Sequence, residues 1–348
     1  MRQQPICLLR ADAGPGIGGG HVTRSLSLAA ALKERGWRIV LASRRPTFET
    51  MPQAAQAVDL AIALEQDEAF EADEIQRACP AASVAIVDHY GRDAAFERKL
   101  RKVAGRIVVL DDEAGLRRHD ADLLIDPGPG NAASAWLAAL PPRSTVLSGA
   151  DYALLPQTVT GRRGNGDVRD RVARVLVSFG LSDSHNMSTH AIVAARRACP
   201  DAQVDVVVGP ASKHRRQVEE AAVQSRASVH VAPANYIDLV VSSDLVIGAG
   251  GVSALERAYL GVPSVVIATA ANQQPAIAAL GATQAVVQAG SAAAFDAGAL
   301  TAAVARAAGD GVLRRKLASA GRAMIDGRGT QRVADAVEKL AAGRDSAA

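Results

Sequence analysis

A glycine-rich turn followed by a histidine is the segment of this chain best suited to chemistry. The run Ile17-Gly18-Gly19-Gly20-His21-Val22-Thr23-Arg24 lies between an apolar segment, residues 6–9, and a run with helical spacing that begins at Leu26. A junction of this kind directs the free backbone N–H groups of a positive helix end at an anion, typically a phosphate. The turn therefore predicts an anion-binding loop, with Gly18, Gly20 and Arg24 at the ligand.

His21 adds a titratable group to that loop. His21 and Arg24 are three residues apart, so their side chains lie on neighbouring parts of one helical face. Because an imidazole exchanges protons near neutral pH, we interpret His21 as a general base or acid close to a bound diphosphate. A purely structural or exposed histidine is the alternative.

The second half of the chain contains a similar turn at Ile247-Gly248-Ala249-Gly250-Gly251-Val252-Ser253-Ala254-Leu255-Glu256. Adjacent glycines at the end of a strand can wrap a diphosphate, with the Ser253 hydroxyl as a donor. Glu256 is placed to accept hydrogen bonds from ribose hydroxyls, as the acidic residue of dinucleotide folds does. The alternative is a capping box in which Ser253 is the N-cap and Glu256 the third helical residue.

Other polar residues follow strands in the same way. Gly180 and Ser182 come after residues 174–179, and Ser182 or Asp183 is suited to cap the next helix. Asn272 and Gln273 follow residues 264–267 and could contact a sugar or phosphate, or form a solvated turn.

Two acidic segments of the first half also lie where open parallel sheets bind ligands, at the carboxyl ends of strands. They are Asp88-His89-Tyr90 and Asp111-Asp112. We expect Asp111 and Asp112 to cap following helices. Neither segment has the spacing of a metal site, so no metal and no cofactor are expected.

A second motif competes for the first glycine turn. Gly14-Pro15-Gly16-Ile17-Gly18-Gly19 satisfies G-x-G-x-x-G, and Arg44-Arg45 end the next strand, where an NADP-dependent enzyme holds its 2′-phosphate. Pro15 stiffens a turn that needs freedom, and the motif leaves His21 and Glu256 unexplained. We therefore favour the first interpretation.

Composition excludes several classes of protein. The net charge of +3 is small and the charges are mixed along the chain, so neither a nucleic-acid stripe nor a polybasic membrane patch is indicated. The three cysteines are isolated and expected to be reduced. No signal-peptide pattern is present and no apolar run reaches the roughly 20 residues of a membrane span. We expect a cytoplasmic, monomeric enzyme that acts on a small molecule.

Short apolar runs alternate with helical patterns throughout, which predicts a doubly wound α/β architecture. We expect two Rossmann-like domains facing one another across a cleft, residues 1–160 and 172–348, joined by a polar, glycine-rich linker at 161–171. The segment Val312 to Leu340 is strongly helical, and this C-terminal helix could cross back to the first domain. The twelve expected strands are residues 6–10, 38–43, 83–88, 106–110, 123–126, 145–148, 174–179, 203–208, 229–232, 245–247, 264–267 and 285–288.

Several motifs, taken in order, resemble those of a known family. They are Ile17-Gly18-x-Gly20-His21-x-x-Arg24, Val87-Asp88-His89-Tyr90, Asp122-Leu123-Leu124-Ile125-Asp126, Gly149-x-x-Tyr152-Ala153-Leu154-Leu155, Ser178-Phe179-Gly180-x-Ser182-Asp183, Gly250-Gly251-x-Ser253-x-x-Glu256-Arg257 and Asn272-Gln273. Together they are similar to the UDP-2,4-diacetamido-2,4,6-trideoxy-β-L-altropyranose hydrolases of pseudaminic acid biosynthesis, relatives of the MurG-type glycosyltransferases. The resemblance extends from about residue 6 to residue 290.

This resemblance implies a GT-B fold with the active site between two domains. It also implies hydrolysis of a UDP-sugar to UDP and free sugar, without a metal, by inverting attack of water on the anomeric carbon. His21 would be the base or water-orienting residue, and Gly250, Gly251, Ser253 and Glu256 would hold UDP. Tyr90 and Asn272 would line the sugar or diphosphate region. Leu181 and Ser184-His185 depart from the family pattern and bear on which sugar is used.

A MurG-like glycosyltransferase is the alternative function. It would apply the same base to an acceptor hydroxyl. An epimerase would instead need groups that remove and restore a sugar proton, and the sequence offers no convincing pair.

Overall fold

The computed structural model describes residues 4–14, 16–163, 168–210 and 212–343. The chain divides into two compact units, residues 1–156 with 327–348, and residues 157–326. Part of the expected linker, residues 164–167, and Pro15 of the competing glycine motif lie outside the described residues.

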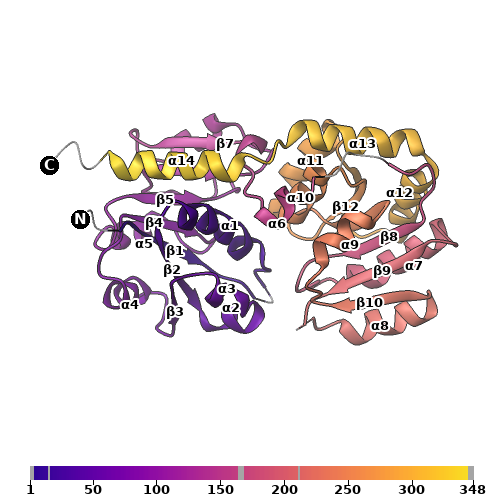
Figure 1. The fold of residues 1–348 in the computed structure, drawn as a ribbon, viewed down its shortest axis with the longest axis horizontal. Helices are drawn as coiled ribbons and strands as arrows, with labels where there is room; N and C mark the ends of the chain where they lie inside the picture. The colour runs from indigo at the N-terminus through magenta and orange to yellow at the C-terminus, as the bar shows by residue number, and fades with distance from the viewer. Residues whose placement is uncertain (1–3, 15, 164–167, 211, 344–348) are drawn as a thin grey trace. The chain divides into compact units, whose positions relative to one another are not determined.

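The first unit is built on a seven-stranded parallel sheet in the order β3-β2-β1-β4-β5-β6-β7 (Figure 1). Its strands are β1 Ile6–Ala11, β2 Arg38–Arg44, β3 Leu60–Leu64, β4 Val84–Asp88, β5 Ile107–Leu110, β6 Leu123–Asp126 and β7 Thr145–Ser148. Its helices are α1 Gly20–Glu34, α2 Arg45–Thr50, α3 Gln53–Gln56, α4 Glu71–Ala78, α5 Ala94–Leu100, α14 Gly329–Ala342 and the 3₁₀ turns η1 Ala133–Ala139 and η2 Ala150–Tyr152.

The second unit has a six-stranded parallel sheet in the order β10-β9-β8-β11-β12-β13. Its strands are β8 Arg174–Ser178, β9 Gln203–Val208, β10 Ala227–Val231, β11 Leu245–Ala249, β12 Ser264–Ala268 and β13 Val287–Ser291. Its helices are α6 Gln157–Thr160, α7 Met187–Ala198, α8 Arg215–Gln224, α9 Tyr236–Ser242, α10 Val252–Leu260, α11 Gln274–Ala282, α12 Ala297–Gly309, α13 Gly311–Met324 and the 3₁₀ turn η3 Ala271–Gln273.

Each unit buries its own apolar core between sheet and helices. In the first, Ile75 of α4 and Phe96 of α5 pack with strand residues around Trp136. In the second, residues of α7, α8 and α12 cover β8, β9 and β11. Central strands are buried along their whole length, as the nearly continuous apolar runs predict.

The expected strands are confirmed, with ends that differ by up to three residues. One further strand, β3, was not expected. Its sequence Leu-Ala-Ile-Ala-Leu alternates between buried and more exposed positions at the edge of the sheet and contains a single β-branched residue. Such a segment gives a weak strand signal until its neighbour β2 is in place.

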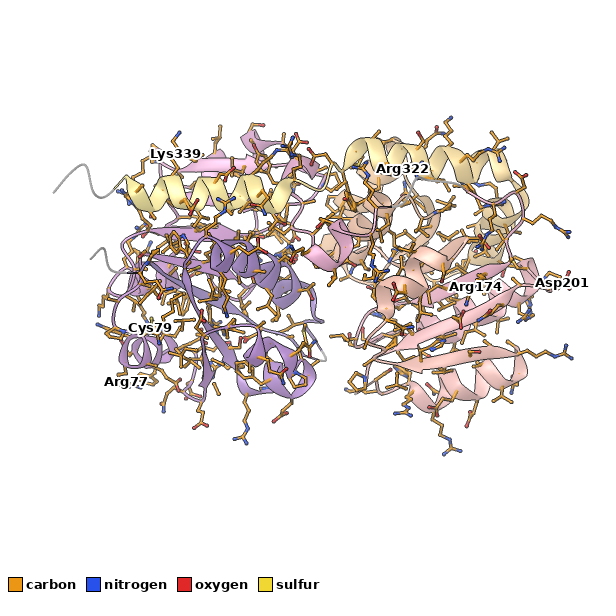
Figure 2. The ribbon with its side chains drawn as sticks, in the orientation of Figure 1. Arg77, Cys79, Arg174, Asp201, Arg322 and Lys339 are labelled. Atoms are coloured by element: carbon orange, nitrogen blue, oxygen red, sulfur yellow. The ribbon has the colours of Figure 1, made fainter. Side chains whose placement is uncertain are left out.

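The C-terminal segment is two helices rather than one helical run, because Gly327 adopts a left-handed φ of +79° between α13 and α14. Whereas the expected second domain ran to residue 348, α14 belongs to the first unit. Gly329 lies against the backbone of Ala153, where a Cβ would approach the carbonyl oxygen to 2.4 Å. Arg35 of α1 also pairs with Glu338 at 2.8 Å. Figure 2 labels Lys339 on α14 and Arg322 on α13.

The three cysteines are free and buried, as expected. Among the described residues, none of the helices combines the length and apolar character that a membrane span requires.

Candidate functional site

The glycine turn and Asp88 meet where the order of the first sheet reverses. Strands β1 and β4 are neighbours, with Ala11 aligned to Asp88, while the chain leaves β1 toward β2 on the other side. Ligands of open α/β sheets bind at the carboxyl ends of the strands at such a switch point. The fold therefore places α1 and the end of β4 at the position expected for a ligand.

The loop before α1 is closed by its own backbone. Gly14 and Gly18 exchange hydrogen bonds of 3.0 and 2.8 Å, and Gly18 needs a glycine because its φ is +76°. Helix α1 then begins at Gly20, with Gly19 as N-cap and no side-chain cap. The first amides of the helix, including those of Gly20 and His21, have no intrahelical acceptor. This end of α1 is chemically suited to an anion.

Asp88 is fully buried and accepts hydrogen bonds from three side chains of α1. His21 Nδ1 lies 2.5 Å from Oδ1, Arg24 donates at 2.7 and 2.8 Å to the two oxygens, and Ser25 Oγ donates at 3.1 Å. Burial by itself would raise the pKa of the Asp88 carboxyl. The charge of Arg24 and the bonds from Arg24 and His21 outweigh burial and hold that pKa well below its usual range. Asp88 is therefore ionised.

This geometry selects one tautomer of His21. A carboxylate can only accept, so the proton of the neutral imidazole is on Nδ1, where it bonds Asp88. The other ring nitrogen, Nε2, then carries a lone pair, and the described residues provide no hydrogen bond to it. A histidine oriented in this way by a buried carboxylate can take a proton from a nucleophile.

Arg24 links this pair to a second carboxylate. Its Nη1 donates to Asp112 Oδ2 at 2.8 Å, and Asp112 Oδ1 accepts from the Tyr90 hydroxyl at 2.5 Å. The Tyr90 ring packs edge-on against the His21 ring, with centroids 4.4 Å apart and an interplanar angle of 82°. Burial, followed by the charge of Asp112, raises the pKa of Tyr90 well above its usual range, so Tyr90 remains a donor.

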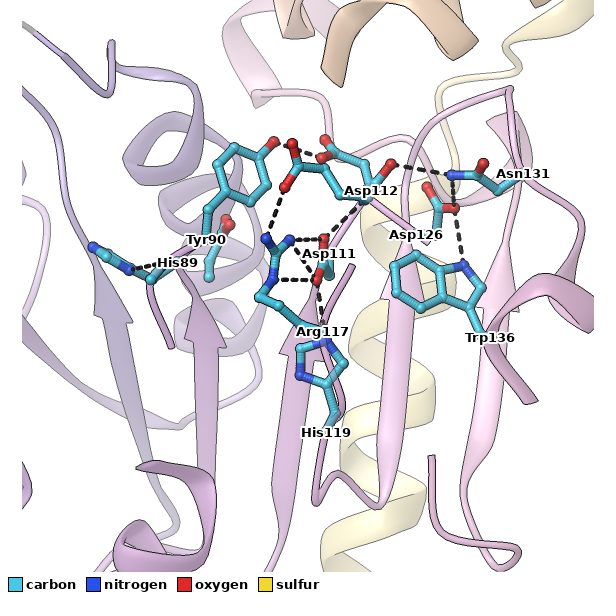
Figure 3. A network of polar contacts seen from close by, with 12 residues as sticks. His89, Tyr90, Asp111, Asp112, Arg117, His119, Asp126, Asn131 and Trp136 are labelled. Atoms are coloured by element: carbon cyan, nitrogen blue, oxygen red, sulfur yellow. Dashed lines mark hydrogen bonds and ion pairs between the residues drawn. The ribbon is translucent and has the colours of Figure 1, made fainter. Parts of the chain in front are cut away.

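A wider polar network surrounds Tyr90 and Asp112 (Figure 3). Arg117 lies over the Tyr90 ring at 5.0 Å and pairs with Asp111 at 2.6 Å and Glu113 at 2.7 Å. His119 bridges Asp111 at 3.0 Å and Glu97 at 2.7 Å. Burial alone would lower the pKa of His119, but the bonds to the two carboxylates outweigh it and raise that pKa to about 9.

The network corrects the expectation that Asp111 and Asp112 cap helices. No helix follows β5 before β6 in this fully described stretch. Asp111 accepts instead from the Glu113 amide, Arg117 and His119, and Asp112 from Arg24 and Tyr90. Asp111 and Asp112, which follow β5, therefore bind side chains from α1, from the segment after β4 and from the segment between β5 and β6.

Asp126, at the end of β6, is held mainly by neutral donors. Its Oδ2 accepts from Asn131 at 2.9 Å and from Trp136 Nε1 at 3.1 Å (Figure 3). Asn131 also donates to the Asp112 carbonyl at 3.1 Å. Burial raises the pKa of Asp126 to about 6. Asp126 therefore supports the loops next to Asp112 with less than a full charge near pH 6.

In the second unit the two glycine turns follow β8 and β11, neighbouring strands at the switch point of that sheet. Gly180 has a left-handed φ of +78°. The carboxylate of Asp183 accepts from the amides of Met187 at 2.8 Å and Ser188 at 3.0 Å. The N-cap residue of α7 is Asn186, whose own side chain does not cap the helix, and Asp183 supplies the capping oxygens instead. Ser182 is partly exposed and does not cap this helix.

The turn after β11 is tightly packed. A Cβ on Gly250 would lie 2.1 Å from Cδ1 of Ile277, and a Cβ on Gly251 would lie 3.6 Å from Gln273 Nε2. Helix α10 begins at Val252 with Gly251 as N-cap and without a side-chain cap. The capping-box alternative is therefore wrong, because Ser253 lies inside the first turn. This leaves the Ser253 hydroxyl outside any capping role.

Glu256 is largely buried on α10, and burial raises its pKa to about 7. Its neighbour Arg257 donates to the Ala249 carbonyl at 2.7 Å and to Ser264 Oγ at 3.2 Å. Arg257 thus fixes the end of β11 through neutral acceptors.

In the first unit, Arg10 pairs with Asp12 at 2.8 Å and with Glu71 at 2.5 Å.

Asn272 and Gln273 form the 3₁₀ turn η3 that precedes α11. Gln273 Oε1 accepts from the Thr269 amide at 2.9 Å, which turns its Nε2 toward Gly251. These residues therefore share one edge of the second unit with Gly250 and Gly251.

The structure adds two residues that sequence reasoning did not assign to the site. Asp88 was noted at the ligand-binding end of a strand and in a family-like motif but was given no role, and Asp112 was expected to cap a helix. Their position at strand carboxyl ends was a usable signal, but their pairing with α1 depends on the order of the sheet. Among the described residues, no group of three or more His, Cys, Asp or Glu side chains could hold a metal ion.

The Arg44 expected at a 2′-phosphate in the competing motif is already paired. Its Nη2 lies 3.1 Å from the buried carboxylate of Glu71. Arg45 begins α2 and faces Glu49 at 3.6 Å.

Comparison with curated proteins identifies distant relatives, while no protein-family model matches the chain. The chain is 24% identical over 334 residues to the spore coat polysaccharide biosynthesis protein SpsG of Bacillus subtilis, covering 95% of this chain and 97% of SpsG. It is 26% identical over 187 residues to the UDP-2,4-diacetamido-2,4,6-trideoxy-beta-L-altropyranose hydrolase of Campylobacter jejuni, covering 52% of this chain and 62% of the hydrolase.

Solved structures resemble the whole chain. MurG of Acinetobacter baumannii superimposes with a TM-score of 0.63 at 13% identity, covering 97% of this chain and all of MurG. The UDP-GlcNAc 2-epimerase of Neisseria meningitidis superimposes with a TM-score of 0.65 at 12% identity over the same shares. This chain has the GT-B fold. The expected fold class, two Rossmann-like domains with parallel sheets, is confirmed.

Proposed function

We propose that this chain is a nucleotide-sugar hydrolase that converts a UDP-linked 2,4-diacetamido-2,4,6-trideoxy sugar to UDP and the free sugar. The observation that carries the proposal is His21, held by ionised Asp88 at 2.5 Å on the first turn of a helix at the switch point of its sheet. The hydrolase of Campylobacter jejuni, named for a substrate of this class, supports the choice of sugar.

In the proposed reaction His21 Nε2 accepts a proton from water as the water oxygen bonds to the anomeric carbon. The bond between that carbon and the UDP oxygen breaks, and its electron pair leaves with UDP. Attack opposite the leaving group inverts the anomeric centre. Asp88 stabilises the imidazolium that forms, because its carboxylate is buried and accepts the Nδ1 proton.

We assign UDP binding to the second unit. The amides of Gly250 and Gly251 and the hydroxyl of Ser253 suit a diphosphate at the start of α10. Glu256 suits the ribose hydroxyls, and Gly180, Ser182, Asn272 and Gln273 the sugar or diphosphate. In the first unit, Gly20 presents its amide, while Gly18, whose amide donates to the Gly14 carbonyl, gives the turn its left-handed backbone. Arg24 and Tyr90 hold the base. Amides and a helix end stabilise the charge that develops on UDP, so the reaction needs no metal.

The test is UDP release from UDP-2,4-diacetamido-2,4,6-trideoxy-β-L-altropyranose with no acceptor present. We expect release by the wild-type protein and a loss of about 10³-fold in His21→Ala, since a general base contributes on the order of 10²–10⁴-fold. His190→Ala is the matched control, because His190 is exposed on α7 of the second unit, where its ring packs beside Phe295.

Each other outcome has a defined meaning. Release that requires an added hydroxyl acceptor would identify a MurG-like glycosyltransferase. Release that is equally fast in His21→Ala and in His190→Ala would contradict the role of His21 as base. Proton NMR of the first product formed should show the anomer opposite to that of the substrate.

A further inference from the structure

Five side chains of the first unit form a closed ring around the proposed base. His21 contacts Asp88, Asp88 contacts Arg24, Arg24 contacts Asp112, and Asp112 contacts Tyr90, at 2.5 to 2.8 Å. Tyr90 closes the ring by packing edge-on against His21 at 4.4 Å. The role of Asp112 in this ring rests on the proposed function of His21 as the base.

The charges in this ring do not cancel while His21 is neutral. Arg24 carries one positive charge, and Asp88 and Asp112 carry one negative charge each, so the ring has a net charge of −1. Tyr90 is neutral because burial and Asp112 raise its pKa. When His21 takes a proton, the ring becomes neutral. A buried cluster is most stable when its charges are paired, so the ring is balanced once His21 carries the proton taken from water.

The other charged groups packed near the ring bond to residues outside it rather than to His21 or Arg24. Arg117, which lies over Tyr90, pairs with Asp111 and Glu113. His119 is held by Asp111 and Glu97. Asp126 approaches Asp112 through Asn131, and His89 pairs with Asp12 at 3.2 Å. Within the ring, Arg24 donates to two carboxylates, Asp88 and Asp112. Asp112 is therefore the second negative charge of the ring.

We propose that Asp112 is a positioning residue that supplies the negative charge balancing the imidazolium of His21 during hydrolysis. It acts through two neighbours. By taking Arg24 Nη1, it prevents Asp88 from being the sole partner of that guanidinium, and by accepting from Tyr90 it holds the ring packed against the imidazole. Its own side chain remains 25% exposed, so it stays accessible to solvent beside the buried Asp88.

The first test needs no substrate. In the full-length protein labelled with ¹⁵N-histidine, the ring-nitrogen signals of His21, assigned by their absence in His21→Gln, are followed against pH. In Asp112→Asn we expect the midpoint of this titration to move to lower pH by about one unit, because a nearby negative charge favours the charged form by that order. Asp112→Glu should restore the midpoint, and Tyr90→Phe, which keeps the charge, should leave it in place.

Asp93→Asn is the matched control. Asp93 is exposed, lies in the same unit, and caps α5 with an oxygen that asparagine also provides. The Asp93→Asn variant loses a carboxylate that does not contact the ring, so the midpoint of the His21 titration in this variant should equal that of the wild type. A midpoint in Asp112→Asn that stays within 0.3 pH units of this control, or that rises, overturns the inference, with about one unit being the expected shift.

The second test uses UDP release. We expect Asp112→Asn to lower kcat by up to about 10-fold with KM changed less than about twofold, since the expected shift of about one pH unit corresponds to that factor in the protonation equilibrium. The low-pH side of its rate profile should move to lower pH. Equal losses in Asp112→Asn and Asp112→Glu would contradict a role of the charge.

Failure of the two proposals can be told apart. If the wild-type protein releases no UDP, the proposed reaction fails, while the nitrogen titration still tests the charge balance. If UDP is released but the titration does not respond to Asp112→Asn, the reaction stands and the task of Asp112 is disproved. Circular dichroism of each variant identifies one that does not fold, and Asp112→Ser, which also removes the charge, then carries the test.

Discussion

At the scale of single residues, the contacts of Asp88 explain why a histidine in a glycine loop can act as a base. Three side chains of α1 donate to this one carboxylate, so Asp88 fixes the tautomer of His21 and the orientation of Arg24 together. Burial excludes water from these contacts and makes each of them stronger than it would be at the surface. The chemistry of the loop thus depends on a residue from another strand.

Asp88→Asn is predicted to lower kcat for UDP release by about 10³- to 10⁴-fold with little change in KM, the order seen when a base loses its orienting carboxylate. Both oxygens of Asp88 accept hydrogen bonds, and an amide replaces one of them by an NH2 group, which would present its donors to donors of α1. Ser25→Ala removes a single 3.1 Å bond to Asp88 and keeps its charge. Its rate should stay within about fivefold of wild type, as expected for one hydrogen bond. Wild-type kcat in a folded Asp88→Asn variant would contradict the dyad.

At the scale of elements, the same arrangement occurs in both units. A strand ends at the switch point of a parallel sheet, a glycine turn follows, and a helix begins without a side-chain cap. In the second unit the glycine is required by packing as well, because the turn after β11 lies against Ile277 of α11. The turn therefore has a defined position relative to α11 and η3.

Gly250→Ala is predicted to destabilise the protein by about 1–3 kcal/mol, the usual cost of overpacking a core position. Its Cβ would lie 2.1 Å from Ile277 Cδ1, so Ile277 must move. Combining it with Ile277→Ala should cost less than the sum of the two single changes, as measured by urea unfolding. Gly309→Ala, with no atom within 4 Å of the added Cβ, is the control and should be neutral or stabilising. Additive effects in the double variant would contradict the packing argument.

At the scale of the whole molecule, each unit has its own core, and the two tryptophans, Trp37 and Trp136, both belong to the first unit. Tryptophan fluorescence therefore reports unfolding of the first unit selectively. That unit also contains the charged network around His119, whose protonation is coupled to folding.

The first unit is predicted to lose stability as pH rises from 7 to 8.5. His119 has a folded pKa of about 9, above its ordinary 6.5, so the folded state binds more protons in this interval. The contribution of His119 to the free energy of unfolding is fully present below pH 6.5 and is lost as the pH rises toward 9. The loss should be roughly 2 kcal/mol over 1.5 pH units. Denaturant unfolding followed by tryptophan fluorescence measures it, and His119→Gln should flatten the curve. An equally steep curve in that variant would exclude His119 as the cause.

Local sequence signals were sufficient to predict the order of most strands and helices, the two-unit α/β class, and the glycine turns with His21, Ser253 and Glu256. Apolar runs, helical spacing and glycine are local signals. The strands of a parallel sheet are buried on both faces, so each of them forms an apolar run that can be recognised in the sequence. The edge strand β3 was missed because its short alternating segment carries little of that signal. The sequence left Ser182 and Asp183 as the two candidates for the cap of α7. Only the folded backbone shows that the Asp183 carboxylate is the one that reaches the first amides of the helix.

Tertiary structure alone decided what surrounds His21. Its partner Asp88 is 67 residues away, and Asp112 reaches Arg24 across 88 residues. The return of α14 to the first unit likewise depends on contacts such as Arg35 with Glu338, 303 residues apart. These pairings follow from the order in which strands assemble, and a carboxylate that binds a base has the same local sequence as one that caps a helix. Sheet order made the difference, because it brought the carboxyl ends of β1, β4 and β5 to one edge.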